Sequence, residues 1–565
     1  MVTDGASHPD RGPSVYPAWI AGIIAAGLYF LTSAPTITWV RDSQDSGELA
    51  ACATILGITH PTGYPLYMLL GWLFIHLLPG GEPGRAMVIL SVVSGGVAVG
   101  ITARAAALAI RLIWKEGRMG RDWAGWWGAF AAGFALTSPL IWSQSVVCEV
   151  YSFAVLLQSL AWLFLVKYLV ACDDGSETGG AYKRVLALVG EGSERRAAGA
   201  VIALGGVLGL ILAHHVAGAA IILPIAIALA RCRFPLSPRL AGKALAAMLP
   251  GLALYLYLPI RSMANPPLDW GNPETFRGFV NHVMAVQYRE LAFGTSWTEF
   301  TRRLDAFRWE DYWGLLALVL FFVGLLAYLP TPKRSPGRAL AVAIPPYIIW
   351  TLLFASGYRV TDYEVFYYPL AVPVSILIAP GLAAFDTMLR RVNRLLPWLL
   401  VAFVAAMLVT AAVNRRVDMN CNAPACNSAA TFAFRELSVL PENSLVVAST
   451  DGHLFSLMYA VTCGVTNPIT AQRLPPRDDI DLVASNWVRR DWFRENVRNR
   501  YGPDGRLKFT SESPDLSIAL RALVDENVPY RPVYVDGRVL QLIRTEGHSY
   551  QASSTVALFR IIPPD

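Results

Sequence analysis

Long apolar stretches separated by short polar connections fill the first three quarters of this chain. They fall at about 17–37, 64–79, 86–113, 124–141, 150–171, 198–230, 244–260, 312–330, 339–357, 367–388 and 397–413. Helices are the expected form, because a helix satisfies its own backbone hydrogen bonds inside lipid. The pattern predicts an α-helical polytopic membrane protein with about 11 to 13 spans.

The stretch 198–230 is long for one span and carries His214-His215 near its middle. Two short spans, or a broken hairpin, that turn at the histidines fit it better. With that break, the basic groups at 231–243, 333–338 and 390–394 share one side, which the positive-inside rule makes cytoplasmic. A cytoplasmic N-terminus puts the first polar loop outside. If 64–79 and 86–113 then each cross the membrane, the basic loop 111–121 also lies outside, against the positive-inside rule. Either one of these two stretches is re-entrant or the span count is wrong by one.

The composition changes after residue 413, where charges become frequent and no spanning stretch follows. Residues 444–449 read as a buried strand, 454–461 as a helix and 557–562 as a further strand. Asp536-Gly537 is a hairpin signal between 530–535 and 538–542. We therefore predict a transmembrane domain over 1–413 and a small soluble α/β domain over 414–565, on the extracytoplasmic side.

Composition supports this division. Hydrophobic residues make up 54% of the chain and charged residues only 16%, which excludes an ordinary soluble protein. The net charge of +6 is modest, and its basic residues lie between apolar stretches, which indicates topology signals rather than nucleic-acid binding. Cys421 and Cys426 are suited to a disulfide if that side is oxidising. A zinc site there would need two more ligands, which the sequence does not offer nearby.

The first polar loop, 38–63, carries an unusual concentration of charge. Arg41, Asp42, Asp45 and Glu48 fall within eight residues, directly after the first apolar stretch. Acids at a bilayer boundary cost free energy unless they are solvated, paired or used. Asp45 and Glu48 share one face if a helix begins at Ser46. The alternative is a solvated loop with a helix N-cap.

The first loop and three later stretches carry distinctive motifs. The loop motif is Asp45-Ser-Gly-Glu48 followed by His60-Pro-x-Gly-Tyr-Pro-Leu-Tyr67. The later stretches are Trp142-Ser-Gln-x4-Glu149-Val-Tyr151, Gly209-x4-His214-His215, and Tyr257-Leu-Pro-x10-Trp270-Gly271 followed by Gly278-Phe-x2-His282. In these motifs, over roughly the first 290 residues, the chain resembles the transmembrane protein 260 family. The resemblance implies a C-type glycosyltransferase (GT-C) fold and an activity like that of the protein O-mannosyltransferases in this family.

The resemblance also implies site roles. Asp45 is expected to act as base toward the acceptor hydroxyl, with Glu48 as the alternative. The donor phosphate and sugar are expected to be bound by residues from several loops: Arg261, His60, His214, His215, Glu149 and Trp270. Each has a structural alternative, such as a helix-end anchor for Arg261 or a buried hydrogen-bonding role for the histidines. Thr62 and Asn272 stand where the family pattern leads us to expect Pro and Asp.

The expected function is transfer of a hexose, with mannose favoured, from a polyprenyl-phosphate donor to a Ser or Thr hydroxyl of protein on the extracytoplasmic face. A glycan or lipid acceptor is an alternative, and a non-enzymatic transporter of lipid-linked sugar is the rival class. We expect no cofactor and no metal. The expected partners are the polyprenyl-phosphate sugar, an acceptor protein or glycan, and the lipid bilayer, but no nucleic acid. The expected location is a bacterial inner membrane. The long loop 261–311 is expected on the extracytoplasmic side.

Overall fold

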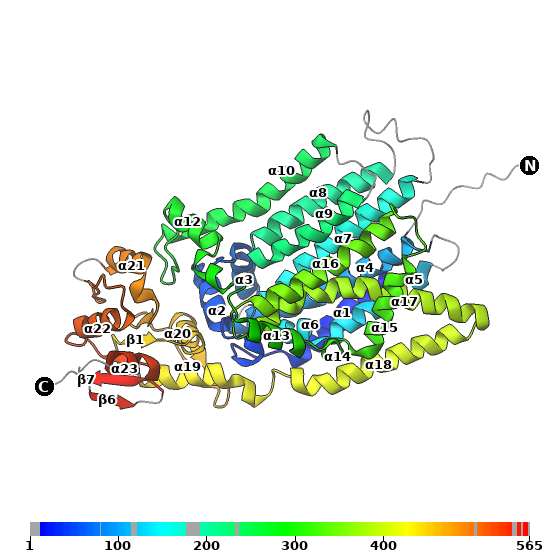
Figure 1. Cartoon of the computed structure of the whole chain (residues 1–565). Helices are drawn as coiled ribbons and strands as arrows, with labels where there is room; N and C mark the ends of the chain where they lie inside the picture. The colour runs from blue at the N-terminus through cyan, green and yellow to red at the C-terminus, as the bar shows by residue number, and fades with distance from the viewer. Residues whose placement is uncertain are drawn as a thin grey trace, which may run out of the picture.

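The computed structural model describes residues 12–78, 81–114, 121–176, 193–231, 237–501, 505–544, 551–554 and 557–562. A bundle of long helices forms the larger part, and the C-terminal α/β domain packs against one end of it (Figure 1). The N-terminus lies at the opposite end of the bundle. The predicted fold class, a polytopic helical protein with a small C-terminal α/β domain, is confirmed.

The bundle and its loops contain the following helices: α1 (Tyr16–Thr32), η1 (Val40–Asp42), α2 (Ser46–Ile55), α3 (Pro65–Leu77), α4 (Pro83–Arg111), α5 (Arg121–Thr137), α6 (Pro139–Ser145), α7 (Tyr151–Ser176), α8 (Ser193–Leu212), η3 (Val216–Ile221), α9 (Ile222–Arg231), α10 (Pro238–Ala253), η4 (Leu254–Leu256), α11 (Tyr257–Ser262), α12 (Phe276–Val283), η5 (Val286–Leu291), α13 (Trp297–Ala306), α14 (Trp309–Tyr312), α15 (Gly314–Ala327), α16 (Pro336–Gly357), η6 (Tyr363–Leu370), α17 (Ala371–Val392) and α18 (Leu396–Met419).

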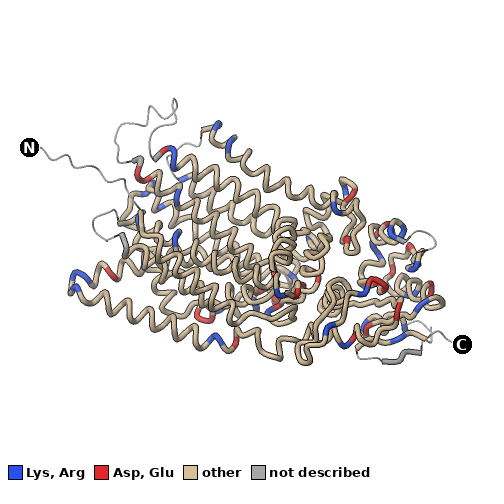
Figure 2. Tube along the Cα trace, turned by 180° about the vertical axis from the view of Figure 1, so that it is seen from behind, with Lys and Arg blue, Asp and Glu red and all other residues tan. Residues whose placement is uncertain are grey.

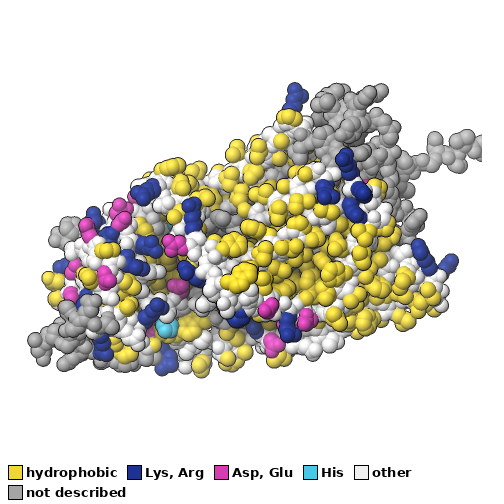
Figure 3. All heavy atoms as spheres, in the orientation of Figure 1, with side chains coloured by type: hydrophobic (Ala, Val, Ile, Leu, Met, Phe, Trp, Pro, Cys, Tyr) yellow, Lys and Arg dark blue, Asp and Glu magenta, His cyan; other side chains and the backbone are white. Residues whose placement is uncertain are grey.

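Seven helical segments of the described chain are long and apolar enough to cross a membrane. They are 83–111, 151–174, 194–212, 238–262, 336–357, 363–392 and 396–419, and four shorter apolar helices accompany them at 16–32, 65–77, 217–231 and 314–327. Hydrophobic side chains cover most of the bundle on the face drawn in Figure 3, whereas the C-terminal domain carries charges of both signs there. This apolar surface is what a bilayer requires of a spanning bundle.

Small residues let the central helices approach closely. A Cβ on Gly22 of α1 would lie 3.0 Å from the Gly96 carbonyl oxygen of α4, and a Cβ on Gly100 would lie 3.0 Å from the Ala18 carbonyl oxygen. Membrane helices associate mainly through such close packing, because lipid supplies no hydrophobic drive between them. The buried helices α4, α7 and α17 form the centre, and α18 lies at the edge of the bundle with most of its surface exposed.

Helix α3 does not cross the bundle. It begins beside His60 and Tyr64, and the chain that follows it returns to the same end, where Arg85 donates to the Ala34 carbonyl at 2.6 Å. A Cβ on Gly71, in the middle of α3, would lie 2.5 Å from Met87 Sδ, only a few residues into α4. Thirteen residues span about 20 Å, too short for a bilayer core. The stretch 64–79 is therefore the re-entrant one, and the basic residue Arg111 falls at the same end as the N-terminal Gly12.

The chain breaks at the histidine pair, as the sequence predicts. Helix α8 ends at Leu212, His214 and His215 occupy the turn, and α9 leads away again (Figure 1). The His215 Nδ1 atom accepts a hydrogen bond from the Ala217 backbone N–H at 3.1 Å, so this side chain caps η3. The turn places both histidines at the end of the bundle that faces the C-terminal domain.

The C-terminal domain contains η7 (Pro424–Asn427), α19 (Ser428–Val439), β1 (Leu445–Ala448), α20 (Asp451–Cys463), β2 (Val465–Thr466), β3 (Arg473–Leu474), β4 (Asp481–Ala484), η8 (Trp487–Arg489), α21 (Asp491–Tyr501), α22 (Leu516–Asn527), β5 (Val533–Val535), α23 (Gly537–Arg544), β6 (Gln551–Ser554) and β7 (Phe559–Ile562). The main sheet has the order β4-β1-β5-β7-β6. Strand β1 pairs in parallel with β4 and β5, and β7 pairs antiparallel with β5 and β6. Helices cover this sheet, as expected for parallel strands buried on both faces.

One prediction for this region is wrong, and one question that the sequence left open has an answer. Asp536-Gly537 does not form a hairpin, because Val539, Leu540 and Ile543 repeat at helical spacing and bury one face of α23. Asp536 caps this helix, accepting the Val539 N–H at 2.8 Å. Cys421 and Cys426 are free, buried thiols rather than a disulfide.

The C-terminal domain is attached firmly to the first loop of the bundle. Gly47 of α2 lies against α20 so closely that a Cβ would come 2.1 Å from the Phe455 carbonyl oxygen. The Trp39 indole N–H donates to the Gly452 carbonyl at 3.0 Å and to the Ser456 hydroxyl at 2.9 Å. Residues more than 400 positions apart in the sequence are therefore joined beside the acidic loop.

Candidate active site

A cavity of about 920 Å³ lies where the first loop, the loop 261–311, the loop 358–366 and the C-terminal domain meet. Its polar side is lined by Asp42, Asp45, His60, Tyr64, Tyr151, His215, Trp270, Tyr288, Arg289, Asp362, Asp451, Trp487, Arg490 and Trp492. Its apolar side is formed by Ala217, Ala219, Ala220, Leu223, Leu291, Ala292, Trp350, Phe354 and Phe366. The cavity thus joins a charged chamber to an apolar arm between membrane helices.

The chamber is organised around His60. Its Nδ1 atom lies 2.5 Å from Oε2 of Glu48, and its backbone N–H donates to Oε1 of Glu48 at 2.8 Å. Its Nε2 atom lies 3.1 Å from the Tyr64 hydroxyl and 3.7 Å from Oδ2 of Asp45. Glu48 is almost completely buried, whereas 36% of the Asp45 side chain is exposed to the cavity. Glu48 therefore orients His60, and Asp45 is the carboxylate that a substrate can reach.

The local fold fixes Asp45 at the N-terminus of a helix. Asp45 is the N-cap residue of α2, and the buried Ser46 hydroxyl donates to the Thr38 carbonyl at 2.9 Å. The Ser43 hydroxyl donates to the Cys148 carbonyl at 3.2 Å, which ties the loop to the segment before α7. The acidic loop is thus a rigid part of the bundle and not a solvated connector.

Neighbouring charges set the protonation of the chamber. Burial lowers the pKa of His60, but the charges of Glu48 and Asp45 and the hydrogen bond with Glu48 outweigh it and raise the pKa to about 9. Burial raises the pKa of Asp45, opposed by His60. Burial likewise raises the pKa of Asp362 to about 6, with Asp45 adding to the rise, and raises that of Asp451. At neutral pH the chamber therefore holds a charged imidazole among carboxylates of increased basicity.

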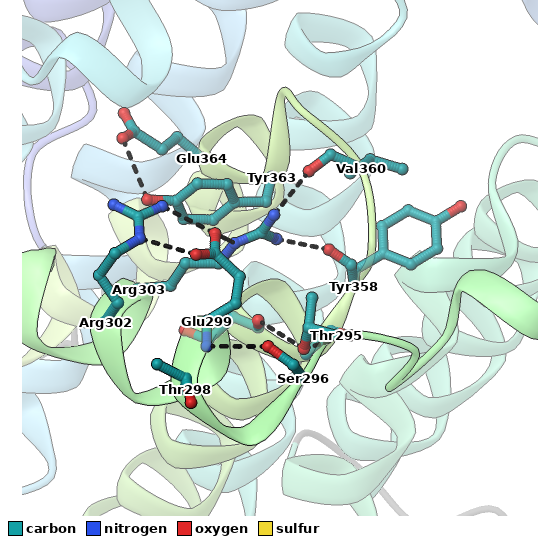
Figure 4. A network of polar contacts seen from close by, with 12 residues as sticks. Thr295, Ser296, Thr298, Glu299, Arg302, Arg303, Tyr358, Val360, Tyr363 and Glu364 are labelled. Carbon is teal, nitrogen blue, oxygen red and sulfur yellow. Dashed lines mark hydrogen bonds and ion pairs between the residues drawn. The ribbon is translucent and has the colours of Figure 1, made fainter.

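A second polar network holds the loop that carries Asp362 (Figure 4). Arg303 of α13 donates to the carbonyl oxygens of Tyr358 at 2.6 Å and Val360 at 3.0 Å. Its guanidinium also lies 4.1 Å from the Tyr363 ring centroid and donates to Glu299 at 2.6 Å. Helix α13 therefore positions one wall of the cavity.

The other residues predicted for donor binding are distributed unevenly. Trp270 and His215 line the cavity with His60. His214 is buried behind it, with Nε2 3.0 Å from the Val150 carbonyl oxygen, and its own carbonyl accepts from Thr62. Glu149 is also buried behind the wall and does not line the cavity. His214 and Glu149 therefore have structural positions in this arrangement.

Arg261 lies outside the cavity, contrary to its predicted place at the donor phosphate. It donates to the carbonyl oxygens of Leu56 at 2.8 Å and Ile55 at 3.1 Å. These carbonyls end α2, where a cation offsets the negative end of the helix dipole. The cations that do line the cavity are Arg289 and Arg490, both on exposed segments at its rim.

Sequence reasoning missed Arg289, Arg490 and Asp451. It found Asp362 only as part of a less specific charged cluster of Tyr358, Arg359, Asp362 and Glu364. Arg490 and Asp451 lie in the C-terminal domain, and nothing local in the sequence indicates that they face the first loop. Among the described residues, no group of three His, Cys, Asp or Glu side chains is arranged to hold a metal ion.

Comparison with known proteins bears on the resemblance seen in the sequence. Residues 45–232 match the family described as the protein O-mannosyl-transferase TMEM260 N-terminal domain. The predicted resemblance to the transmembrane protein 260 family is confirmed. The chain is 24% identical over 559 residues to the protein O-mannosyl-transferase tmem260 of Dictyostelium discoideum, covering 90% of this chain and 62% of that protein. It is 28% identical over 298 residues to the mouse protein, covering 51% of this chain and 38% of that one.

The chain therefore spans less than two thirds of the length of these relatives. Among solved structures, it is similar to ArnT from Cupriavidus metallidurans in the apo state, with a TM-score of 0.57, 14% identity, and coverage of 97% of this chain and 98% of that chain. ArnT bound to undecaprenyl phosphate gives a TM-score of 0.55 at 14% identity, covering 96% and 97% of the two chains. The fold is that of the GT-C glycosyltransferases.

Proposed function

We propose that this chain is an integral-membrane glycosyltransferase that moves a hexose, mannose by preference, from a polyprenyl-phosphate donor to a Ser or Thr hydroxyl of protein. The observation that carries the proposal is the cavity itself. A basic carboxylate, Asp45, faces a charged chamber, and the chamber continues into an apolar arm that suits a polyprenyl chain. The relatives' names and the fold support the same class.

In the proposed reaction, Asp45 accepts the proton of the acceptor hydroxyl as its oxygen attacks the anomeric carbon. The bond from that carbon to the phosphate oxygen breaks, and polyprenyl phosphate leaves, so a single displacement inverts the anomeric centre. The raised pKa of Asp45 makes it a stronger base. Arg289 and Arg490 at the rim, and the charged His60, would balance the negative charge that grows on the phosphate.

The remaining polar groups suit sugar recognition. Asp362 and Asp451 can accept hydrogen bonds from sugar hydroxyls, and Trp270, Trp487 and Trp492 offer ring faces and indole N–H donors. The indole nitrogens of Trp270 and Trp487 are buried and make no hydrogen bond within the described structure. No step of this mechanism requires a metal or a cofactor.

We also propose that the cavity opens on the extracytoplasmic side of a bacterial inner membrane. Lys and Arg residues gather at the other end of the bundle, where the N-terminus lies (Figure 2). They include Arg104, Arg111, Arg231, Arg338 and Arg390. Excess positive charge marks the cytoplasmic side of a membrane protein.

Sugar transfer in purified membranes tests the proposal. Radiolabelled polyprenyl-phosphate mannose is supplied to wild type, Asp45→Asn and Asp305→Asn at equal expression. Asp305 is the control, since it is an exposed aspartate of α13 that does not line the cavity. We expect label in protein with wild type and Asp305→Asn, and a loss of about 100-fold or more with Asp45→Asn.

Any other result of this assay changes the proposed acceptor, the proposed base or the proposed class of protein. Label in lipid or glycan would replace the protein acceptor. Equal activity of Asp45→Asn and wild type would exclude Asp45 as the base. No transfer from any polyprenyl-phosphate hexose by folded protein would favour a transporter of lipid-linked sugar. The clustering of acids at one end of the bundle, rather than at its middle, opposes that rival.

A further inference from the structure

A second cavity, of about 390 Å³, lies at the end of the bundle opposite the active site. Helices α4, α7 and α8 form it together with Gly12. Four cationic side chains and one acid line it, namely Arg104, Arg111, Lys167, Arg196 and Asp174. Its other walls are apolar or small: Leu108, Phe164, Val170, Ala171, Gly199 and Ala200.

The charges form two layers. Arg111 and Asp174 lie near the ends of α4 and α7, and Asp174 pairs with Arg111 at 3.7 Å and with Arg196 at 3.2 Å. Arg104 and Lys167 each lie seven residues further inside the same two helices. Seven residues are about two turns, so this inner pair lies about 10 Å deeper than the outer one.

The inner layer has positive charge without a matching acid. Arg104 donates to the Pro13 carbonyl at 2.5 Å, and the Lys167 ammonium lies 5.2 Å from the Phe164 ring centroid. Neither forms an ion pair with any carboxylate in the described part of the chain. Cations this far inside a membrane domain cost free energy unless an anion accompanies them.

Simple anchoring of the helix ends does not account for this arrangement. An anchoring Lys or Arg extends toward water, where its charge is solvated. The Arg104 side chain is instead half-buried and directed to the chain beside Pro13, on the wall of an open cavity. A Cβ added to Gly199 would meet no atom within 4 Å, so the wall formed by α8 leaves room beside the cations.

We propose that this cavity binds the phosphate of an anionic phospholipid, held by Arg104 and Lys167, in the leaflet opposite the active site. The small and apolar side chains of α7 and α8 then lie along the acyl chains. A phosphate diester matches the two inner cations in charge, and Arg196 and Arg111 lie where the rest of a headgroup would emerge. The apolar walls favour a lipid over free phosphate, which would leave them in contact with water.

Lipid titration of the purified, delipidated chain in detergent tests this site. Phosphatidylglycerol, phosphatidylcholine and inorganic phosphate are compared by thermal unfolding and by native mass spectrometry. The variants are Arg104→Gln and Lys167→Gln, with Arg334→Gln as the control, because Arg334 is an exposed cation at the same end of the bundle. We expect phosphatidylglycerol alone to raise Tm, and each inner variant to weaken its binding about fivefold.

Several outcomes would overturn the proposal. Phosphatidylcholine that stabilises as well as phosphatidylglycerol would show that no anion is recognised, and inorganic phosphate that does so at equal concentration would exclude the lipid. Unchanged phosphatidylglycerol binding by Lys167→Gln would place the lipid elsewhere. Lys167 is exposed, so this variant decides the matter even if Arg104→Gln fails to fold.

Discussion

The charge on His60 depends on Glu48, and this dependence sets the upper pH limit of the proposed reaction. The neighbouring carboxylates raise the His60 pKa from 6.5 to about 9 against the effect of burial. This rise corresponds to about 3 kcal/mol, or about a 300-fold gain in proton affinity. Because the folded-state pKa is raised, the stabilising charge is fully present below pH 6.5 and is lost as the pH rises through about 9.

Glu48→Gln keeps the side-chain size but removes the charge. Burial then acts on His60 with only Asp45 opposing it, so we expect its pKa to fall to about 6.5 or lower. Two measurements follow the change. The rate of sugar transfer between pH 6 and 10 should decline above about pH 9 in wild type and above about pH 6.5 in the variant. Diethyl pyrocarbonate, which modifies neutral imidazole, should label the His60 peptide at pH 7.5 only in the variant.

Asp305→Asn, which changes an exposed acid outside the cavity, is the control, and its transfer rate should decline at the wild-type pH. If Glu48→Gln instead keeps the decline near pH 9, the carboxylate does not set the charge of His60. If diethyl pyrocarbonate readily modifies His60 in wild type at pH 7.5, the ring is neutral at that pH. Either result refutes the reasoning from the 2.5 Å contact between these two side chains.

Three further substitutions test hydrogen bonds and close packing in other parts of the structure. Arg303→Gln should lower the free energy of unfolding by about 2 kcal/mol, because two hydrogen bonds to carbonyl oxygens are lost, and should weaken donor binding. Arg302→Gln, which changes an exposed side chain, should do neither, and KM for the donor compares the two variants. Asp536→Ala should destabilise the C-terminal domain by about 1 to 3 kcal/mol, because it removes the cap of α23 and the acceptor for Ser449; denaturant unfolding measures this. Gly324→Ala should lower Tm by several degrees, since its Cβ would lie 1.8 Å from a carbonyl oxygen of α17.

Features that depend on local chemistry could be predicted from the sequence. Apolar runs give the spanning helices, because each span must bury its own backbone groups wherever it packs. The break at His214-His215 follows from a stretch too long for one crossing. The acidic loop could be predicted as a functional region, because acids such as Asp45 and Glu48 cost free energy at a membrane boundary unless they are solvated, paired or take part in function.

Features that depend on which groups meet in space could not be predicted. A cation such as Arg261 can serve a bound phosphate or the end of a helix, and only the fold shows that it meets the carbonyls of α2. The α3 stretch is apolar enough to span, and its contacts with α2 and α4 alone reveal that it does not. At Asp536-Gly537 the turn signal was real, but the apolar spacing that follows it made a helix.

The largest gap concerns the C-terminal domain, and it changes how the active site is understood. The membrane domain supplies Asp45 and His60, whereas Asp451 and Arg490 reach the same cavity from the C-terminal domain. Docking through Gly47 leaves no room for even a methyl group against α20. Burial raises the pKa of Asp45, and the C-terminal domain covers the cavity. Without this domain the cavity would open to water and the cause of the raised pKa would be lost. If the proposed function holds, the C-terminal domain therefore belongs to the catalytic unit and is not an accessory to it.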